Sequence, residues 1–267
     1  MESAGGVSLY LKEPDLPAPG TLADVFSAVY PLSHEEAFHR ARHCWGILAE
    51  NISEEEAARL QDACRQAGLE LLRLEADKAP RPPAPARARS LAMDGEGFTC
   101  QLDGDEKARC LWTELDIAAA APVKEDIVRK ETPVQGPSFA RAASIITTIA
   151  TGLPVSFGSK QPEQTRETVI REMNYVMDLC FAGRRLRLRS DDMDYSSLGP
   201  DKTYSSQGNF RALACRLEPL AAAALKNKGL KLIAARQPLQ SLSYDSAADF
   251  ERDFRRLFAL FACARRG

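Results

Sequence analysis

The amino-acid sequence predicts an α+β protein with a small β-α-α-β-α-β N-terminal domain, followed by an antiparallel sheet domain with C-terminal helices. Three observations support this fold class. Capped helical patterns alternate with short apolar runs in the first 75 residues, β-type runs separated by turn residues follow, and an aromatic stripe at helical spacing comes last. We therefore expect a domain over residues 1–77, a Pro-rich linker over 78–89 and a second domain over 90–267.

The chain opens with a predicted strand and a short helix. Residues 7–11 (VSLYL) form an apolar run of strand length. A helix follows, because four apolar residues spaced three and four apart share one face: Leu22, Val25, Phe26 and Val29.

The second predicted helix begins at Ser33, which has Glu36 three positions later in the pattern of a capping box. Ala37, Phe38 and Ala41 are expected to begin its buried side. Gly46 ends this helix, because glycine adopts the left-handed conformation of helix ends without strain, and a short apolar strand follows.

A third helix repeats this pattern. Ser53 and Glu56 form another capping box, and Gly68 provides the stop. The cap is worth roughly 1 kcal/mol. Residues 70–74 then read as the closing strand.

Residues 7–75, about a quarter of the chain, resemble the C-terminal domain of the bacterial ribosomal stalk protein. Glu36-Ala37, Ser53 to Ala57 and Ala67-Gly68 match the helix starts and the last helix end of that family. The ClpS adaptor family has a similar fold, and HCWG at residues 43–46 is similar to its helix end. The resemblance implies a docking domain that binds a protein partner.

The helix that carries the stalk family's binding lysines corresponds to residues 33–44, and it departs from the family here. Residues 7–75 hold six Lys or Arg and twelve Asp or Glu, a net charge of −6. A role in recruiting translation GTPases is therefore not expected, and the partner protein is unknown. We predict that four residues of this helix contact it: His34, Glu35, His39 and Arg42.

The linker prediction is based on four prolines between Ala79 and Ala86, which favour an extended spacer. Beyond it, residues 90–102 and 108–118 read as β segments around the turn 103–105. Residues 175–181 and 184–190 form a second predicted hairpin around Gly183. These strands followed by helices resemble small PH-like domains.

The segment between these hairpins is harder to interpret. Residues 140–151 fit either a helix or a buried strand, and residues 164–174 favour a short helix. Residues 152–160 (GLPVSFGSK) resemble a phosphate-binding loop superficially, but their glycine spacing is wrong. We therefore expect no nucleotide and no other cofactor.

The last third is predicted to be helical. A helix over residues 209–226 carries Pro219 and ends at Gly229, and Ser246 caps a final helix with Asp249 at its third position. The final helix has a stripe of apolar residues at helical spacing: Phe250, Phe254, Leu257, Phe258 and Phe261. The stripe favours packing on the sheet, with a homodimer interface as the alternative.

Composition limits the possible partners and location. The net charge of −2 makes nucleic acid an unlikely partner, and no apolar run has the length of a membrane span. Seven cysteines without a CxxC pair indicate reduced thiols. We therefore expect a cytoplasmic protein, and the resemblance to the ribosomal stalk family implies a bacterial one.

The docking domain predicts a non-enzymatic adaptor or protein-interaction protein, and two alternatives to this adaptor hypothesis stay open. An anion-binding module for lipid head groups or RNA would use a basic strand with nearby lysines: Arg185, Arg187, Arg189, Lys226 and Lys228. A metal-dependent enzyme would use His39 and His43, which lie four residues apart. Asp191, Asp192 and Asp194 indicate a turn rather than a calcium site, because the EF-hand spacing is absent.

Overall fold

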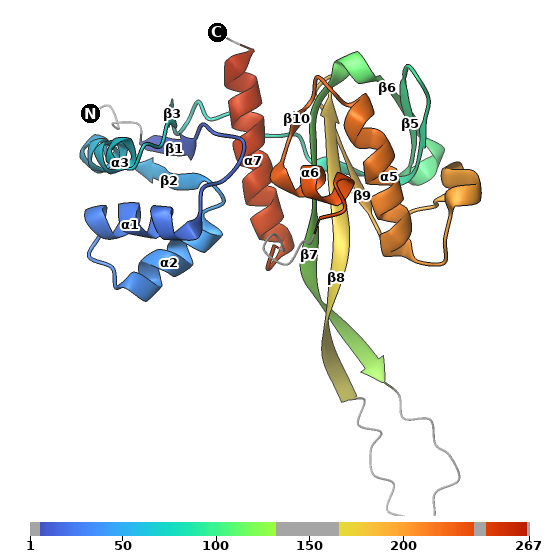
Figure 1. The fold of residues 1–267 in the computed structure, drawn as a ribbon, viewed down its shortest axis with the longest axis horizontal. Helices are drawn as coiled ribbons and strands as arrows, with labels where there is room; N and C mark the ends of the chain where they lie inside the picture. Colours follow the sequence, from blue (N-terminus) through green and yellow to red (C-terminus); the bar gives the residue numbers. More distant parts are fainter. Residues whose placement is uncertain (1–5, 132–165, 238–243, 266–267) are drawn as a thin grey trace, which may run out of the picture. The chain divides into compact units, whose positions relative to one another are not determined.

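The computed structural model describes residues 6–131, 166–237 and 244–265. It contains helices together with two sheets, which confirms the predicted α+β class (Figure 1). Residues 1–125 and 173–267 form one compact unit, and residues 126–172 form a second. The predicted segments 140–151 and 152–160 lie outside the described residues.

Residues 7–75, called here the first module, have the predicted β-α-α-β-α-β order. The sheet order is β2-β1-β3, and both pairings are antiparallel. The elements are β1 (Val7–Leu11), α1 (Pro19–Val29), α2 (His34–His43), β2 (Ile47–Ile52), α3 (Glu54–Gln66) and β3 (Leu71–Glu75).

The helix starts follow from the predicted serine caps. The side chain of Ser33 accepts a hydrogen bond from the backbone of Glu36, and the carboxylate of Glu36 accepts one from the backbone of Ser33. Ser53 caps α3 in the same way, but Glu56 does not complete the box. Instead, its carboxylate accepts a hydrogen bond of 2.7 Å from the hydroxyl of Tyr30.

The core of the first module includes the predicted apolar face of α1. Leu22, Val25 and Phe26 of α1 are buried, as are Leu60 and Cys64 of α3. The expectation for Phe38 was wrong: it is 42% exposed, because the two buried alanines of α2 face the sheet from another side of the helix.

The Pro-rich segment is shorter than predicted. Strand β4 begins at Pro85, and residues 85–87 pair in parallel with residues 185–187 of β9. Pro85 is the first residue of its strand, a position at which proline loses no ladder hydrogen bond. The part of the linker without regular structure or a turn therefore ends at residue 84.

The second sheet has seven strands within the described ranges, in the order β10-β7-β8-β9-β4-β5-β6. It is mixed rather than purely antiparallel, because β4 pairs in parallel with β9 and β10 in parallel with β7. The strands are β4 (Pro85–Met93), β5 (Gly97–Leu102), β6 (Lys107–Leu111), β7 (Leu115–Glu131), β8 (Arg166–Phe181), β9 (Arg184–Arg189) and β10 (Leu225–Lys226).

Two local predictions in this sheet were wrong. Residues 90–102 contain two paired strands, since β4 turns into β5 after Met93. The helix expected over residues 164–174 is part of β8, which begins at Arg166. Pairing with neighbouring strands in the sheet overrides the weak helical pattern there.

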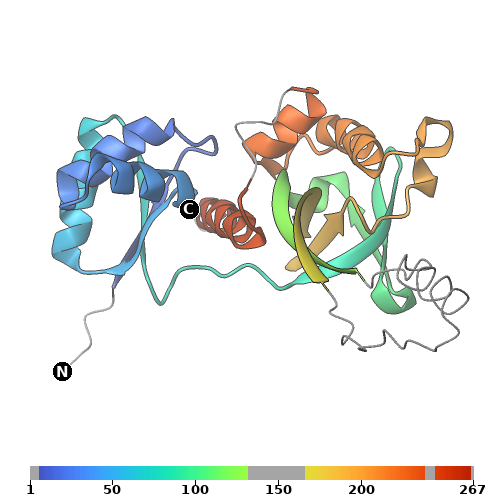
Figure 2. The same ribbon diagram turned by 90° about the horizontal axis from the view of Figure 1, so that it is seen from below.

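Three helices cover the two faces of β7 and β8 (Figure 2). Helices α5 (Ser206–Leu220) and α6 (Lys228–Ala234) share a core with Ala118 and Ala120. Helix α7 (Ala247–Ala264) packs on the opposite face, against Ile117 and Ala119. These four residues belong to β7, and adjacent residues of a strand point to opposite faces. Strand β7 is therefore buried on both sides.

Gly229 does not end a helix as expected. It lies in α6, where an added Cβ would collide with the carbonyl oxygen of Ala120. Glycine therefore allows α6 to approach β7 closely. The preceding helix ends at Leu220, close to Pro219.

Helix α7 contacts both the sheet and the first module. Phe250, Phe254 and Leu257 are buried in the sheet core, whereas Ala259 packs with Tyr10 and Ile47 of the module. Most of the stripe is thus buried in the core of its own chain. Only Phe258 and Phe261 of the stripe are partly exposed, and the homodimer interface stays a prediction for these two residues. None of the described helices combines the length and apolar character needed to cross a bilayer.

Candidate functional site

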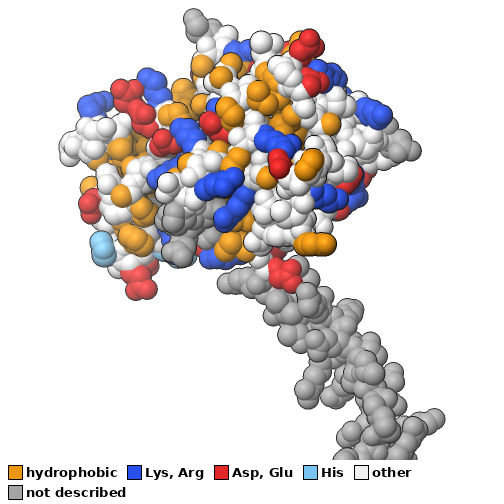
Figure 3. Space-filling view, turned by 45° about the vertical axis from the view of Figure 1, so that its right-hand side comes forward, with side chains coloured by type: hydrophobic (Ala, Val, Ile, Leu, Met, Phe, Trp, Pro, Cys, Tyr) orange, Lys and Arg blue, Asp and Glu red, His pale blue; other side chains and the backbone are white. Residues whose placement is uncertain are grey.

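Helix α2 presents the residues predicted to contact a partner. Its capping box fixes its start, and Ala37 and Ala41 hold its inner side against the module core. His34, Glu35 and His39 are therefore exposed on the remaining surface, next to Phe38. Figure 3 shows histidine side chains at the surface beside acidic ones.

Arg42, the fourth predicted residue, lies one turn after His39 on α2. It is exposed, and its guanidinium is 3.5 Å from a carboxylate oxygen of Asp245. That carboxylate is already held by Lys124 at 2.6 Å, and this bond keeps the pKa of Asp245 below its ordinary value. The structure thus exposes all four predicted residues on α2, and Arg42 also contacts a carboxylate outside this helix.

The two histidines considered as metal ligands are neighbours. The ring centroids of His39 and His43 are 4.5 Å apart, and Nδ1 of His43 is 3.7 Å from Asp249. In the described part of the chain, no three or more His, Cys, Asp or Glu side chains form a group that could hold a metal ion.

The arginines of the predicted anion site have carboxylate partners within the chain. Arg185 is buried and donates to Asp178 and Glu251, with its guanidinium 3.7 Å from the ring centroid of Phe254. Arg187 donates to the same two carboxylates. Burial opposes ionisation of Glu251, but the two guanidinium groups outweigh it and lower its pKa.

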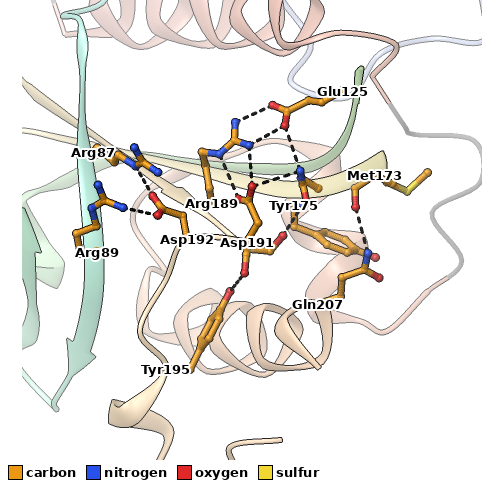
Figure 4. Close-up of polar contacts among 12 residues, drawn as sticks. Arg87, Arg89, Glu125, Met173, Tyr175, Arg189, Asp191, Asp192, Tyr195 and Gln207 are labelled. Atoms are coloured by element: carbon orange, nitrogen blue, oxygen red, sulfur yellow. Dashed lines mark hydrogen bonds and ion pairs between the residues drawn. The ribbon is translucent and has the colours of Figure 1, made fainter. Parts of the chain in front are cut away.

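The end of β9 continues this network (Figure 4). Arg189 points between Glu125 and Asp191 and donates to both, at 2.7 and 3.0 Å. Asp192 is held by Arg87 and Arg89. The aspartates after β9 thus make structural ion pairs, which fits the predicted turn.

The two predicted lysines differ from each other. Lys226 donates to the carboxylate of Glu218 at 2.8 Å and to its backbone carbonyl at 2.7 Å. Lys228 is exposed, and no described carboxylate pairs with it. The structure therefore does not gather the five predicted basic residues into one surface.

A pocket of about 500 Å³ was not predicted from the sequence. It is bounded by the segment before α1, by α2 and by α7, and its wall includes Leu16, Phe38 and Trp45. Trp45 has a positive φ of 48° and stacks on Tyr244 with ring centroids 4.0 Å apart.

Buried polar groups form one side of this pocket. The hydroxyl of Tyr244 donates a hydrogen bond to Asp253 at 2.6 Å. Burial raises the pKa of Tyr244 well above the ordinary tyrosine value. Arg256 donates to Asp253 at 3.1 Å and to the backbone carbonyls of Glu13 and Pro14. Gly46 makes room for this arginine, since a Cβ there would overlap its side chain.

One signal in the sequence could have located this pocket. Asp253 and Arg256 interrupt the apolar stripe of α7, at positions that share its buried side. Buried charged residues require partners, so their position on the stripe indicates a polar network at this point. The loop from Glu13 to Leu16 gave no comparable pattern.

The cysteines are free thiols, and five of them are buried. Burial raises the pKa of Cys64 and Cys180 to about 11 and that of Cys100 and Cys110 to about 12. A thiol with so high a pKa is a poor nucleophile at neutral pH. These four cysteines are therefore structural.

Comparisons with known proteins do not add to this description. The chain matches no protein-family model, no curated protein and no solved structure.

Proposed function

We propose that this chain is a non-enzymatic interaction protein whose first module docks a partner protein through the exposed face of α2. The observation that carries the proposal is the exposure of His34, Glu35 and His39 beside Phe38, which is 42% exposed. A large apolar side chain among polar ones on a rigid, capped helix is suited to protein recognition.

The charge of the first module defines the kind of partner. Residues 7–75 carry a net charge of −6. A partner with a basic surface around an apolar contact would complement this module. Its association should therefore weaken as salt screens the charges.

The anion-binding alternative has less support. Arg185, Arg187 and Arg189 are occupied by carboxylates of their own chain, so a phosphate would have to displace existing ion pairs. Replacing a charge-assisted bond with an equivalent one yields little net affinity. The adaptor reading needs no such exchange.

Affinity capture with the full chain tests the proposal. Bait proteins would be the unaltered chain and a triple variant, His34→Ala with Glu35→Ala and His39→Ala, exposed to a lysate of the source cells. Partners should be retained by the unaltered chain, released by raised salt and lost from the triple variant.

A matched control uses the exposed face of α3. Glu55→Ala with Gln66→Ala removes the same charge from another exposed helix of the module. All three baits should have the same melting temperature, because the substituted residues are exposed. Equal recovery of every partner by the triple variant would eliminate the α2 face as the docking site.

A further inference from the structure

The pocket beside Trp45 has the properties of a small-molecule site. Its volume of about 500 Å³ lies within the range typical of ligand pockets, about 300–1,000 Å³. Leu16, Leu22 and Phe38 contribute apolar surface to its wall. An apolar body would therefore be removed from water on entering.

The charged side of the pocket is already compensated. Asp253 and Arg256 neutralise one another at 3.1 Å, and Tyr244 donates its hydroxyl to the same aspartate. Both charged side chains are almost completely buried, which fixes their positions. This side gives the pocket a rigid wall without a net charge.

The remaining charged residues of the lining are both basic. Lys228 and Arg42 both line the pocket and are exposed. Lys228 has no ion-pair partner in the described ranges, and Arg42 has only the 3.5 Å contact to an aspartate that Lys124 holds more closely. The indole N–H of Trp45, another lining residue, is buried without a described acceptor.

We propose that this pocket binds a small amphipathic monoanion, an apolar body that carries one carboxylate. The apolar part lies against Leu16, Phe38 and Trp45, and the carboxylate accepts hydrogen bonds from Lys228 and Arg42. A charge-assisted bond of this kind is stronger than one between neutral groups, so an anion is preferred over an alcohol of equal length. Phe38 lies both in this pocket and on the proposed docking face of α2, whereas His34, Glu35 and His39 do not line the pocket.

Fluorescence titration of the full chain with 8-anilinonaphthalene-1-sulfonate, an apolar ring system with one sulfonate, tests the site. The fluorescence enhancement should saturate as the probe is added, and octanoate should displace the probe. Displacement by 1-octanol should require a concentration at least about tenfold higher than that of octanoate. Lys228→Gln should weaken both probe and octanoate by about tenfold. Lys107→Gln, which removes the charge of another exposed lysine, should change the binding of neither.

A blocking variant separates this pocket from other apolar surface. Ala18 lines the pocket, is exposed and makes no side-chain cap bond, so Ala18→Trp fills the space without removing a helix cap. Probe binding should be lost in this variant while the melting temperature is kept. Undiminished probe binding to Ala18→Trp, or equal displacement by octanoate and octanol, would overturn the proposal.

Discussion

At the scale of single residues, Asp178 is a charged residue in the interior of the large sheet. Its carboxylate is fully buried, and it accepts hydrogen bonds from both Arg185 and Arg187. Glu251 from α7 shares the same two arginines. The four side chains therefore depend on one another, and loss of one leaves a buried charge without its partner.

Asp178→Ala should lower the free energy of unfolding by about 3–5 kcal/mol, because Arg185 would stay buried with less compensation. Urea denaturation measures this loss. Asp103→Ala removes the carboxylate of an exposed ion pair with Arg89 and serves as the comparison. Similar losses in the two variants would contradict the dependence on burial.

Acid should destabilise the protein through carboxylates whose pKa is lowered in the folded state. Arg189 lowers the pKa of Glu125, and that of Glu251 is lowered despite burial. Each contributes stability that is present above the ordinary glutamate pKa of 4.5 and is lost as the pH falls through the lower folded value.

We therefore expect the free energy of unfolding to decrease from about pH 5 downwards. Glu125→Gln with Glu251→Gln should be less stable at neutral pH and should lose less on acidification. Denaturation at a series of pH values measures both effects. An unchanged slope below pH 5 in this variant would assign the acid sensitivity to other carboxylates.

At the scale of elements, helix caps explain why the chain order was legible from sequence. Ser33, Ser53 and Ser246 all accept the predicted backbone hydrogen bond. Caps act locally, so three-residue spacing is sufficient to identify them. The strands of the second sheet depend on distant partners, and the helix expected at residues 164–174 failed for that reason.

Ser246→Ala should cost roughly 1 kcal/mol, because the backbone N–H of Asp249 loses its acceptor at the start of α7. Thermal and urea unfolding measure the difference. Ser206→Ala, at an exposed first-turn position of α5 with no described side-chain bond, is the matched control. A loss of the same size in the control would show that the serine hydroxyl, rather than the cap, is responsible.

The candidate site was only partly predictable at this scale. The exposed face of α2 follows from its own 3.6-residue period, so His34, Glu35 and His39 were identified correctly as surface residues. The pocket requires α2, α7 and the loop around Leu16 to meet, and no local pattern encodes that meeting. The anion site predicted from the arginines of β9 was not found as a free basic surface. Strand alternation predicts the spacing of these arginines, but it does not reveal the carboxylates that lie opposite them.

At the scale of the whole molecule, α7 links two hydrophobic cores. Arg252 donates to the backbone carbonyls of Cys44 and Ile47, and Arg255 pairs with Glu50. The other side of the helix is buried on the large sheet. Unfolding of either core therefore removes packing from the other.

Calorimetry should consequently record one cooperative unfolding transition for the unaltered chain. Arg252→Ala with Arg255→Ala removes contacts to the first module only, and it should separate this transition into two. Arg265→Ala, which removes a more exposed ion pair at the end of α7, should leave a single transition. Two transitions in the unaltered chain would refute the coupling.

The position of α7 in the chain also has a consequence for biosynthesis. The first module leaves the ribosome early, yet Tyr10 and Ile47 obtain their cover only when residues 247–264 have been translated. Domains begin to fold as they emerge, so a nascent chain would expose this apolar surface during most of its elongation. We therefore expect the elongating chain to bind chaperones more readily than the finished protein does.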